Sequence, residues 1–146
     1  MLENISFIAS FIALAFSILT YIANIIHDRK RDTLAAFNVL QNEALDKLNQ
    51  IRPAEIQEIA RHPATEEYKL VSGYIARIEH FCAGINLKIY DRETVYELAH
   101  GYFDSEMLSS RVDPIINKKH RNAIEDYYKN YHIVVEWMKS HRKKIV

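Results

Sequence analysis

The chain has 146 residues, a length that suits one domain of ordinary size. Its 19 Lys and Arg residues balance its 19 Asp and Glu residues, which argues against non-specific nucleic-acid binding, because that requires a basic excess. Three glycines and three prolines are too few for the many turns of a β-sandwich or a barrel. The one cysteine excludes an internal disulfide and a multi-cysteine zinc site. We therefore predict an all-α protein.

A long apolar segment lies near the N-terminus. No charged residue occurs from Ile5 to Ile26, and at ~1.5 Å per residue a helix of this length spans about 33 Å, enough to cross a bilayer core. Arg29, Lys30 and Arg31 follow it and are expected to lie at the membrane surface. The positive-inside rule then predicts an external N-terminus and a cytoplasmic C-terminal part. The competing interpretation, a cleaved signal peptide, requires positive charge before the segment and a small-residue cleavage site after it.

Small and polar residues of this segment recur every three or four positions, which is a heptad stripe on one helix face. The stripe consists of Ser6, Ser10, Ala13, Ser17, Thr20 and Asn24. Such a face lets membrane helices approach closely and hydrogen-bond to one another, and an amide in lipid needs a partner. We therefore predict that the protein binds further copies of itself through this stripe, and three or more copies would line a narrow lumen. In the alternative, each hydroxyl bonds to its own helix backbone.

The membrane helix, assigned to residues 1–27, is expected to continue as a cytoplasmic stalk over residues 28–52. Neither glycine nor proline interrupts the chain between Ile5 and Arg52. Apolar residues at helical spacing give the stalk an apolar side. They are Leu34, Phe37, Leu40, Ala44, Leu48 and Ile51. Residues 53–146 are predicted to form a small helical bundle with short loops.

Local signals predict the first helices of the bundle. Arg52-Pro53 ends the stalk, and a short helix follows up to Arg61. Thr65 is predicted to cap the next helix, which ends near Gly84-Ile85-Asn86. Asp91 is predicted to cap a short helix that stops near Gly101.

Two further helices are expected toward the C-terminus. Residues 104–112 are predicted to be helical. Asp113-Pro114 is either the cap and first turn of a long last helix, which runs to about Arg142, or a kink.

Catalytic motifs are missing from the sequence. It contains no HExxH, P-loop, GxGxxG or GxSxG motif. Arg77 and His80 could share a helix face near Cys82, but a metal site there would need further ligands. We therefore predict no catalytic residue, no metal ligand and no cofactor.

The segment 70–138 carries a series of motifs. They are Ile78-Glu79-His80-Phe81-Cys82-Ala83-Gly84-Ile85, Tyr90-Asp91, Pro114-Ile115-Ile116, Arg121, Tyr127-Tyr128 and Trp137. In these motifs the segment resembles the bacterial and phage family DUF4760, a domain of unknown function whose members have an N-terminal membrane segment and a basic stalk. Where relatives often have an Asn-aromatic-aromatic-Glu sequence, this chain has Ala76-Arg77-Ile78-Glu79. The resemblance implies a structural ion pair between Glu79 and Arg121 across two helices.

The architecture also resembles small single-pass accessories of antiviral systems, including type VI-B CRISPR systems, some of which assemble as rings and breach the inner membrane. We therefore expect a self-associating protein of the bacterial inner membrane that perturbs the membrane as a defence effector. The alternative is a membrane-tethered adaptor whose helical domain binds a cytoplasmic protein. An enzyme, most plausibly a nuclease, is a third hypothesis that lacks its motifs. The expected partners are the lipid bilayer, further copies of the chain and, in the second hypothesis, that protein, but no nucleic acid.

Overall fold

The computed structural model describes residues 2–103, 105–116 and 128–145, and within these ranges the chain forms helices and no strand. The prediction of an all-α protein is confirmed. The elements in chain order are α1 (Leu2–Leu40), the π-helix η1 (Gln41–Leu45), α2 (Asp46–Gln50), α3 (Pro53–Arg61), α4 (Glu66–Asn86), α5 (Arg92–Phe103), α6 (Glu106–Ile116) and α8 (Lys129–Ile145).

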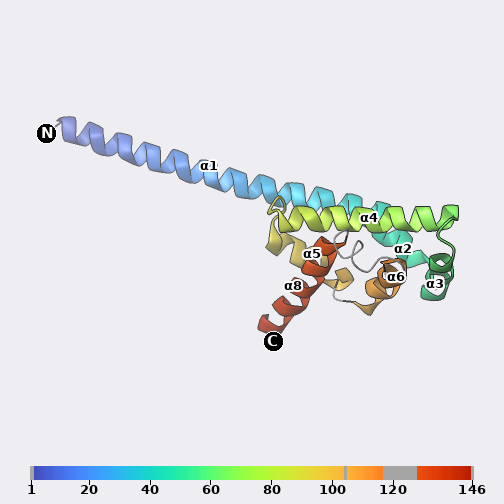
Figure 1. The fold of residues 1–146 in the computed structure, drawn as a ribbon. Coiled ribbons are helices and arrows are strands. Elements are labelled where there is room, and N and C mark those ends of the chain that lie inside the picture. Colours follow the sequence, from blue (N-terminus) through green and yellow to red (C-terminus); the bar gives the residue numbers. More distant parts are fainter. Residues whose placement is uncertain (1, 104, 117–127, 146) are drawn as a thin grey trace.

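Figure 1 shows that α1 is a long helix whose first half extends away from the rest of the molecule. Its second half lies beside α4, which runs in the opposite direction. The other helices gather on one side of this pair, where α8 packs against α4, α6 against α3, and α5 against α1. The bundle therefore lies to one side of the axis of α1.

The predicted stalk is part of the bundle core. Phe37, Leu40 and Leu48 are buried, as its apolar pattern predicts. Leu34 is 44% exposed, so it does not belong to the buried side. Thr33 is buried instead. Burial of its hydroxyl is tolerated because it donates to the Arg29 carbonyl at 2.7 Å and accepts the backbone N–H of residue 91 at 2.8 Å.

The helix that begins with α1 continues to Gln50, but residues 41–45 form a π-helical turn that its sequence pattern did not predict. A π turn accommodates one more residue than an α turn. Both Ala44 and Leu45 therefore lie in the core. The chain becomes extended at Ile51, and α3 starts at Pro53, as predicted.

The predicted caps of α4 and α5 are confirmed. The Thr65 hydroxyl accepts the backbone N–H of Tyr68 at 3.3 Å. The Asp91 carboxylate accepts the backbone N–H and the hydroxyl of Thr94, at 3.0 and 2.7 Å. The predicted end of α5 near Gly101 is two residues early, since the helix continues to Phe103, whose side chain is buried in the core.

The C-terminal helices differ from the prediction at Pro114. This proline lies inside α6, so its assignment to the first turn of the last helix is wrong. The helix continues past it to Ile116, and burial of Ile115 and Ile116 offsets the missing backbone N–H. The last helix, α8, begins at Lys129.

Gly84 allows the ring of Tyr90 to pack on α4. A Cβ at this position would lie 2.8 Å from Cδ2 of Tyr90 and closer still to Cε2. The ring cannot move freely, because it stacks on Phe81 with 5.0 Å between centroids. We expect Gly84→Ala to lower the free energy of unfolding by up to about 2 kcal/mol, since overpacking costs about 1–3 kcal/mol and helix propensity returns roughly 1 kcal/mol.

Thermal unfolding of the full-length chain in nanodiscs measures this effect, and Gly73→Ala is its matched control. Gly73 also lies in α4, but a Cβ there meets no atom within 4 Å. Gly73→Ala should therefore raise the melting temperature. Equal stabilisation by the two substitutions would contradict the packing role of Gly84.

Candidate functional site

The first half of α1 is apolar and exposed. Its most apolar window has a mean hydropathy of 1.7, and none of that window is buried. The large apolar side chains exposed there include Phe11, Ile12, Leu14, Phe16, Ile18, Leu19, Ile22, Ile25 and Ile26. By length and composition this helix is able to cross a membrane. A signal sequence meets the same criteria, as does the core helix of a soluble protein, but a core helix would be buried.

The stripe residues all lie in α1. Ser10, Ala13, Ser17, Thr20 and Asn24 are exposed. For Ser6 the structure places the backbone only, and its side chain is outside the described part. The Ser17 hydroxyl donates to the carbonyl of Ala13 at 2.9 Å, which is the bond to its own helix backbone that the alternative to self-association predicts. Its oxygen keeps acceptor capacity for a second helix.

The three basic residues after the apolar segment differ in their surroundings. Arg31 forms ion pairs with Asp28 at 3.4 Å and with Asp32 at 3.7 Å, all three being exposed. Lys30 is exposed on the same helix. Arg29 donates a hydrogen bond from Nη2 to the backbone carbonyl of Lys88. The basic flank is thus attached to the loop between α4 and α5.

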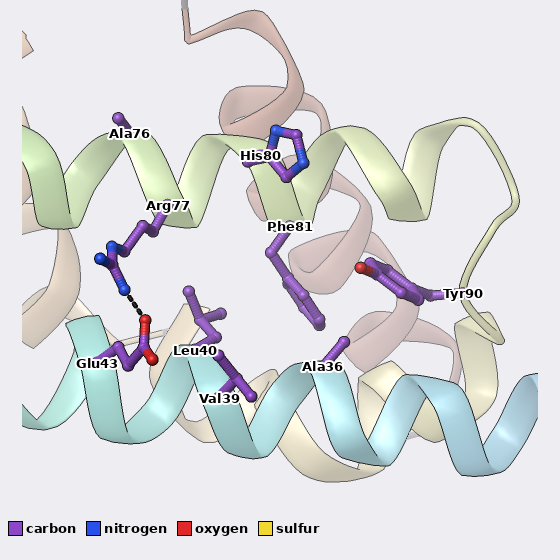
Figure 2. A pocket seen from close by; sticks show the side chains of 9 residues that line it. All are labelled: Ala36, Val39, Leu40, Glu43, Ala76, Arg77, His80, Phe81 and Tyr90. Carbon is purple, nitrogen blue, oxygen red and sulfur yellow. Dashed lines mark ion pairs between the residues drawn. The ribbon is translucent and has the colours of Figure 1, made fainter.

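A groove of about 430 Å³ lies between the second half of α1 and α4. Figure 2 shows Arg77 and Glu43 facing each other at one end, where they form an ion pair. Phe81 and Tyr90 lie at the other end, and His80 extends from α4 above it. The remaining lining residues are Ala36, Val39, Leu40 and Ala76. The groove is therefore an apolar surface groove between two helices, with charged groups at one end.

Arg77 and His80 share a helix face, as their spacing suggested, but Cys82 does not join them. Both Arg77 and His80 line the groove, whereas Cys82 is fully buried in the core. Burial, and secondarily the Glu79 carboxylate, raise the pKa of the Cys82 thiol well above its ordinary value. The thiol is therefore protonated at neutral pH and unsuited to nucleophilic attack. Among the described residues, no three His, Cys, Asp or Glu side chains are grouped to hold a metal ion.

Glu79 binds the N-terminus of α8. One carboxylate oxygen accepts the backbone N–H of Asn130 at 3.1 Å and its side-chain amide at 2.8 Å, and the other accepts the N–H of Tyr131 at 2.7 Å. These are the second and third N–H groups of α8, which a capping side chain normally satisfies. Tyr128 precedes the helix and is not a capping residue type. Arg121 lies outside the described residues, so its ion pair with Glu79 stays a prediction.

Arg111 is an important residue that our sequence reasoning missed. It is 7% exposed, and its Nε donates to the carbonyls of Leu48 at 2.9 Å and Ile51 at 3.0 Å. Its other nitrogens donate to the carbonyls of Met107 at 2.7 Å and Asn49 at 3.4 Å. The guanidinium therefore donates to the carbonyls at the C-terminus of α2, of which the Leu48 carbonyl also accepts the N–H of Ile51 at 3.1 Å.

The sequence contained a signal for this role. Leu108, Val112 and Ile115 share one helix face, and Arg111 lies on that same face. A cation within an apolar stripe must have polar partners, because a buried charge without them is costly. The signal predicts that partners exist, although it does not identify them.

The chain matches no protein-family model, no curated protein and no solved structure. The resemblance to DUF4760 and the carry-over from it therefore stay predictions.

Proposed function

We propose that this protein is a single-pass protein of the bacterial inner membrane that self-associates through its membrane helix. The observation that carries the proposal is the first half of α1, which extends from the bundle with its apolar side chains exposed. Removal of such surface from water is favourable by roughly 25 cal/mol per Å². The bundle does not cover this surface, whereas a bilayer would cover it completely.

The geometry of α1 supports assembly through the stripe. Asn24 and Thr33 are nine positions apart, which is about 2.5 turns at ~3.6 residues per turn, so they face opposite directions. Thr33 faces the bundle and bonds to Asp91. The stripe therefore faces away from the bundle. Copies that meet through the stripe would carry their bundles on the outside, where the bundles do not collide.

The orientation in the membrane follows from the basic flank. Arg29, Lys30 and Arg31 would keep the bundle in the cytoplasm under the positive-inside rule. Three or more helices joined by the stripe would surround a narrow lumen with hydroxyl groups. We propose that this assembly makes the membrane leaky, as an effector of an antiviral defence system. The defence role rests on the architectural resemblance alone.

The mass of the full-length protein in nanodiscs or detergent tests the assembly. We expect a discrete multimer, and we expect the triple substitution of Ser10, Ser17 and Asn24 by Leu to convert it to a monomer. The cause is the loss of close approach and of interhelical hydrogen bonds along one face. The matched control replaces Ile12, Ile18 and Ile25 by Leu, which keeps the stripe and should keep the multimer. A monomer for the unsubstituted chain would refute self-association.

A membrane-tethered adaptor without catalytic activity is the second candidate, and the groove between α1 and α4 favours it. An apolar groove beside an Arg77–Glu43 ion pair is suited to an apolar side chain from a partner protein. Ion release from liposomes that contain the full-length chain separates the two candidates. The effector should release ions and lose this activity in the triple Leu variant. A multimer that releases no ions would favour the adaptor.

A further inference from the structure

We propose that the loop between α4 and α5, residues 87–91, docks on the lipid surface beside α1 and holds the bundle against the membrane. The inference rests on the proposed membrane anchoring and adds a second membrane contact to it. The bilayer is the occupant that the position of the loop selects.

The loop exposes two large apolar side chains on either side of a cation. Leu87 is 72% exposed and Ile89 is 60% exposed, and Lys88 lies between them. Apolar side chains that insert into the headgroup region beside a basic residue are typical of protein segments that bind a membrane surface. Exposure of two large apolar side chains to water is unfavourable.

The backbone of the loop is fixed in the geometry that exposes these side chains. The N–H of Lys88 donates to the Ile85 carbonyl at 3.1 Å and the N–H of Ile89 to the Gly84 carbonyl at 2.9 Å, which is a Schellman motif. Lys88 has a φ of 59°, in the left-handed region where glycine is the usual residue. In this motif an apolar residue at the position of Ile89 normally packs back on the helix, but the residue it would meet is Gly84, which has no side chain.

Two hydrogen bonds place the loop at the level of the membrane surface. Arg29 bonds to the carbonyl of Lys88, and the Thr33 hydroxyl bonds to the N–H of Asp91. Arg29 lies three positions beyond Ile26, the last apolar residue of the segment, which is about 4.5 Å along the helix. A headgroup layer extends roughly 5–7 Å beyond the hydrocarbon core on each side. The loop therefore lies beside the part of α1 that would leave the lipid.

Cations lie close to the loop, together with the carboxylates of Asp28, Asp32 and Asp91. Arg29 and Lys30 lie beside the loop on α1, and Lys88 lies within it. Figure 1 shows the C-terminal end of α8 at the same end of the bundle, the end from which α1 extends. Juxtamembrane cations are attracted by anionic headgroups.

A nitroxide spin label on the full-length chain in nanodiscs of phosphatidylcholine and phosphatidylglycerol tests the proposal. Leu87→Cys reports on the loop, and Ile18→Cys reports on the membrane segment. Leu70→Cys is the matched control, because Leu70 is an exposed leucine (56%) like Leu87 but lies in the half of α4 nearer its N-terminus. The native Cys82 is fully buried, and labelling of the unsubstituted chain measures its background.

We expect the ratio of oxygen to nickel-complex accessibility to be several-fold higher at Leu87 than at Leu70, and highest at Ile18. Equal ratios at Leu87 and Leu70, with a high ratio at Ile18, would overturn the docking and leave the anchor intact. An accessibility ratio at Ile18 like that of a water-exposed site would overturn both the docking of the loop and the membrane anchoring. Dipolar broadening between labels at Leu87, with exclusion of both reagents, would identify a second copy of the chain as the occupant and overturn the lipid assignment.

Discussion

Replacement of Arg111 by Met should destabilise the bundle by about 3–5 kcal/mol, which is the largest loss we expect from a single substitution. Methionine fills a similar volume but donates no hydrogen bond. The carbonyls of Leu48 and Ile51 would lose their charged donor, and a hydrogen bond to a charged group contributes about 1.5–3 kcal/mol. The Leu48 carbonyl would keep the N–H of Ile51 as a donor. The positive charge that opposes the negative end of the α2 dipole would also be lost.

Thermal unfolding of the full-length chain in nanodiscs measures this loss, and a decrease in melting temperature of about 10 °C or more is expected. Arg61→Met is the control. Arg61 is exposed and pairs with Glu58 at 2.8 Å, and such surface pairs contribute roughly 0–1 kcal/mol. Arg111→Lys keeps the charge but lacks the planar guanidinium group with its several donors. Its decrease in melting temperature should lie between those of Arg111→Met and Arg61→Met. If Arg111→Met and Arg61→Met had equal effects, the capping role would be refuted.

Glu79→Ala should detach the N-terminus of α8 from α4 and cost about 2–4 kcal/mol. The substitution removes acceptors for two backbone N–H groups and one side-chain amide, and hydrogen bonds to a charged group contribute about 1.5–3 kcal/mol. It also removes a negative charge from the positive end of the helix dipole. The effect should be confined at first to this end of α8, where the Asn86 amide still donates to the backbone carbonyl and side-chain oxygen of Asn130.

Hydrogen exchange of the Tyr131 amide is the direct measurement, since its N–H lies 2.7 Å from the carboxylate. We expect loss of protection in Glu79→Ala and partial retention in Glu79→Gln, which keeps one acceptor oxygen. Glu97→Ala changes an exposed carboxylate on α5 and should leave the amide protected. Unchanged protection in Glu79→Ala would show that another group caps α8.

Local features of the fold were predictable and long-range ones were not. Thr65 and Asp91 were identified as caps because each satisfies N–H groups three residues away, so the sequence contains the complete interaction. Three of the four carbonyl partners of Arg111, those of Leu48, Asn49 and Ile51, lie 60 or more positions away. Only packing of α6 against the end of α2 brings them together with Arg111.

The same difference between local and long-range features applies to the candidate site. The apolar segment is evident as a run without charge and its stripe as a periodic pattern, because both consist of residues of one helix whose backbone groups bond to each other. The groove between α1 and α4 was not evident, since its two walls are separate segments that only tertiary packing brings together. The Glu79–Arg121 pair was inferred from resemblance, whereas the bonds from Glu79 to α8 follow from tertiary packing.

The continuity of α1 with the bundle has a mechanical consequence. From Leu2 to Gln50 the chain is helical without a glycine or proline, and its second half is locked in the core. In the proposed membrane orientation, the apolar segment and the bundle would consequently move as one rigid unit. A rotation of the helix about its axis turns the bundle through the same angle, and a tilt within the lipid swings the bundle sideways. A protein that binds the bundle and rotates it would therefore rotate the proposed membrane helix as well.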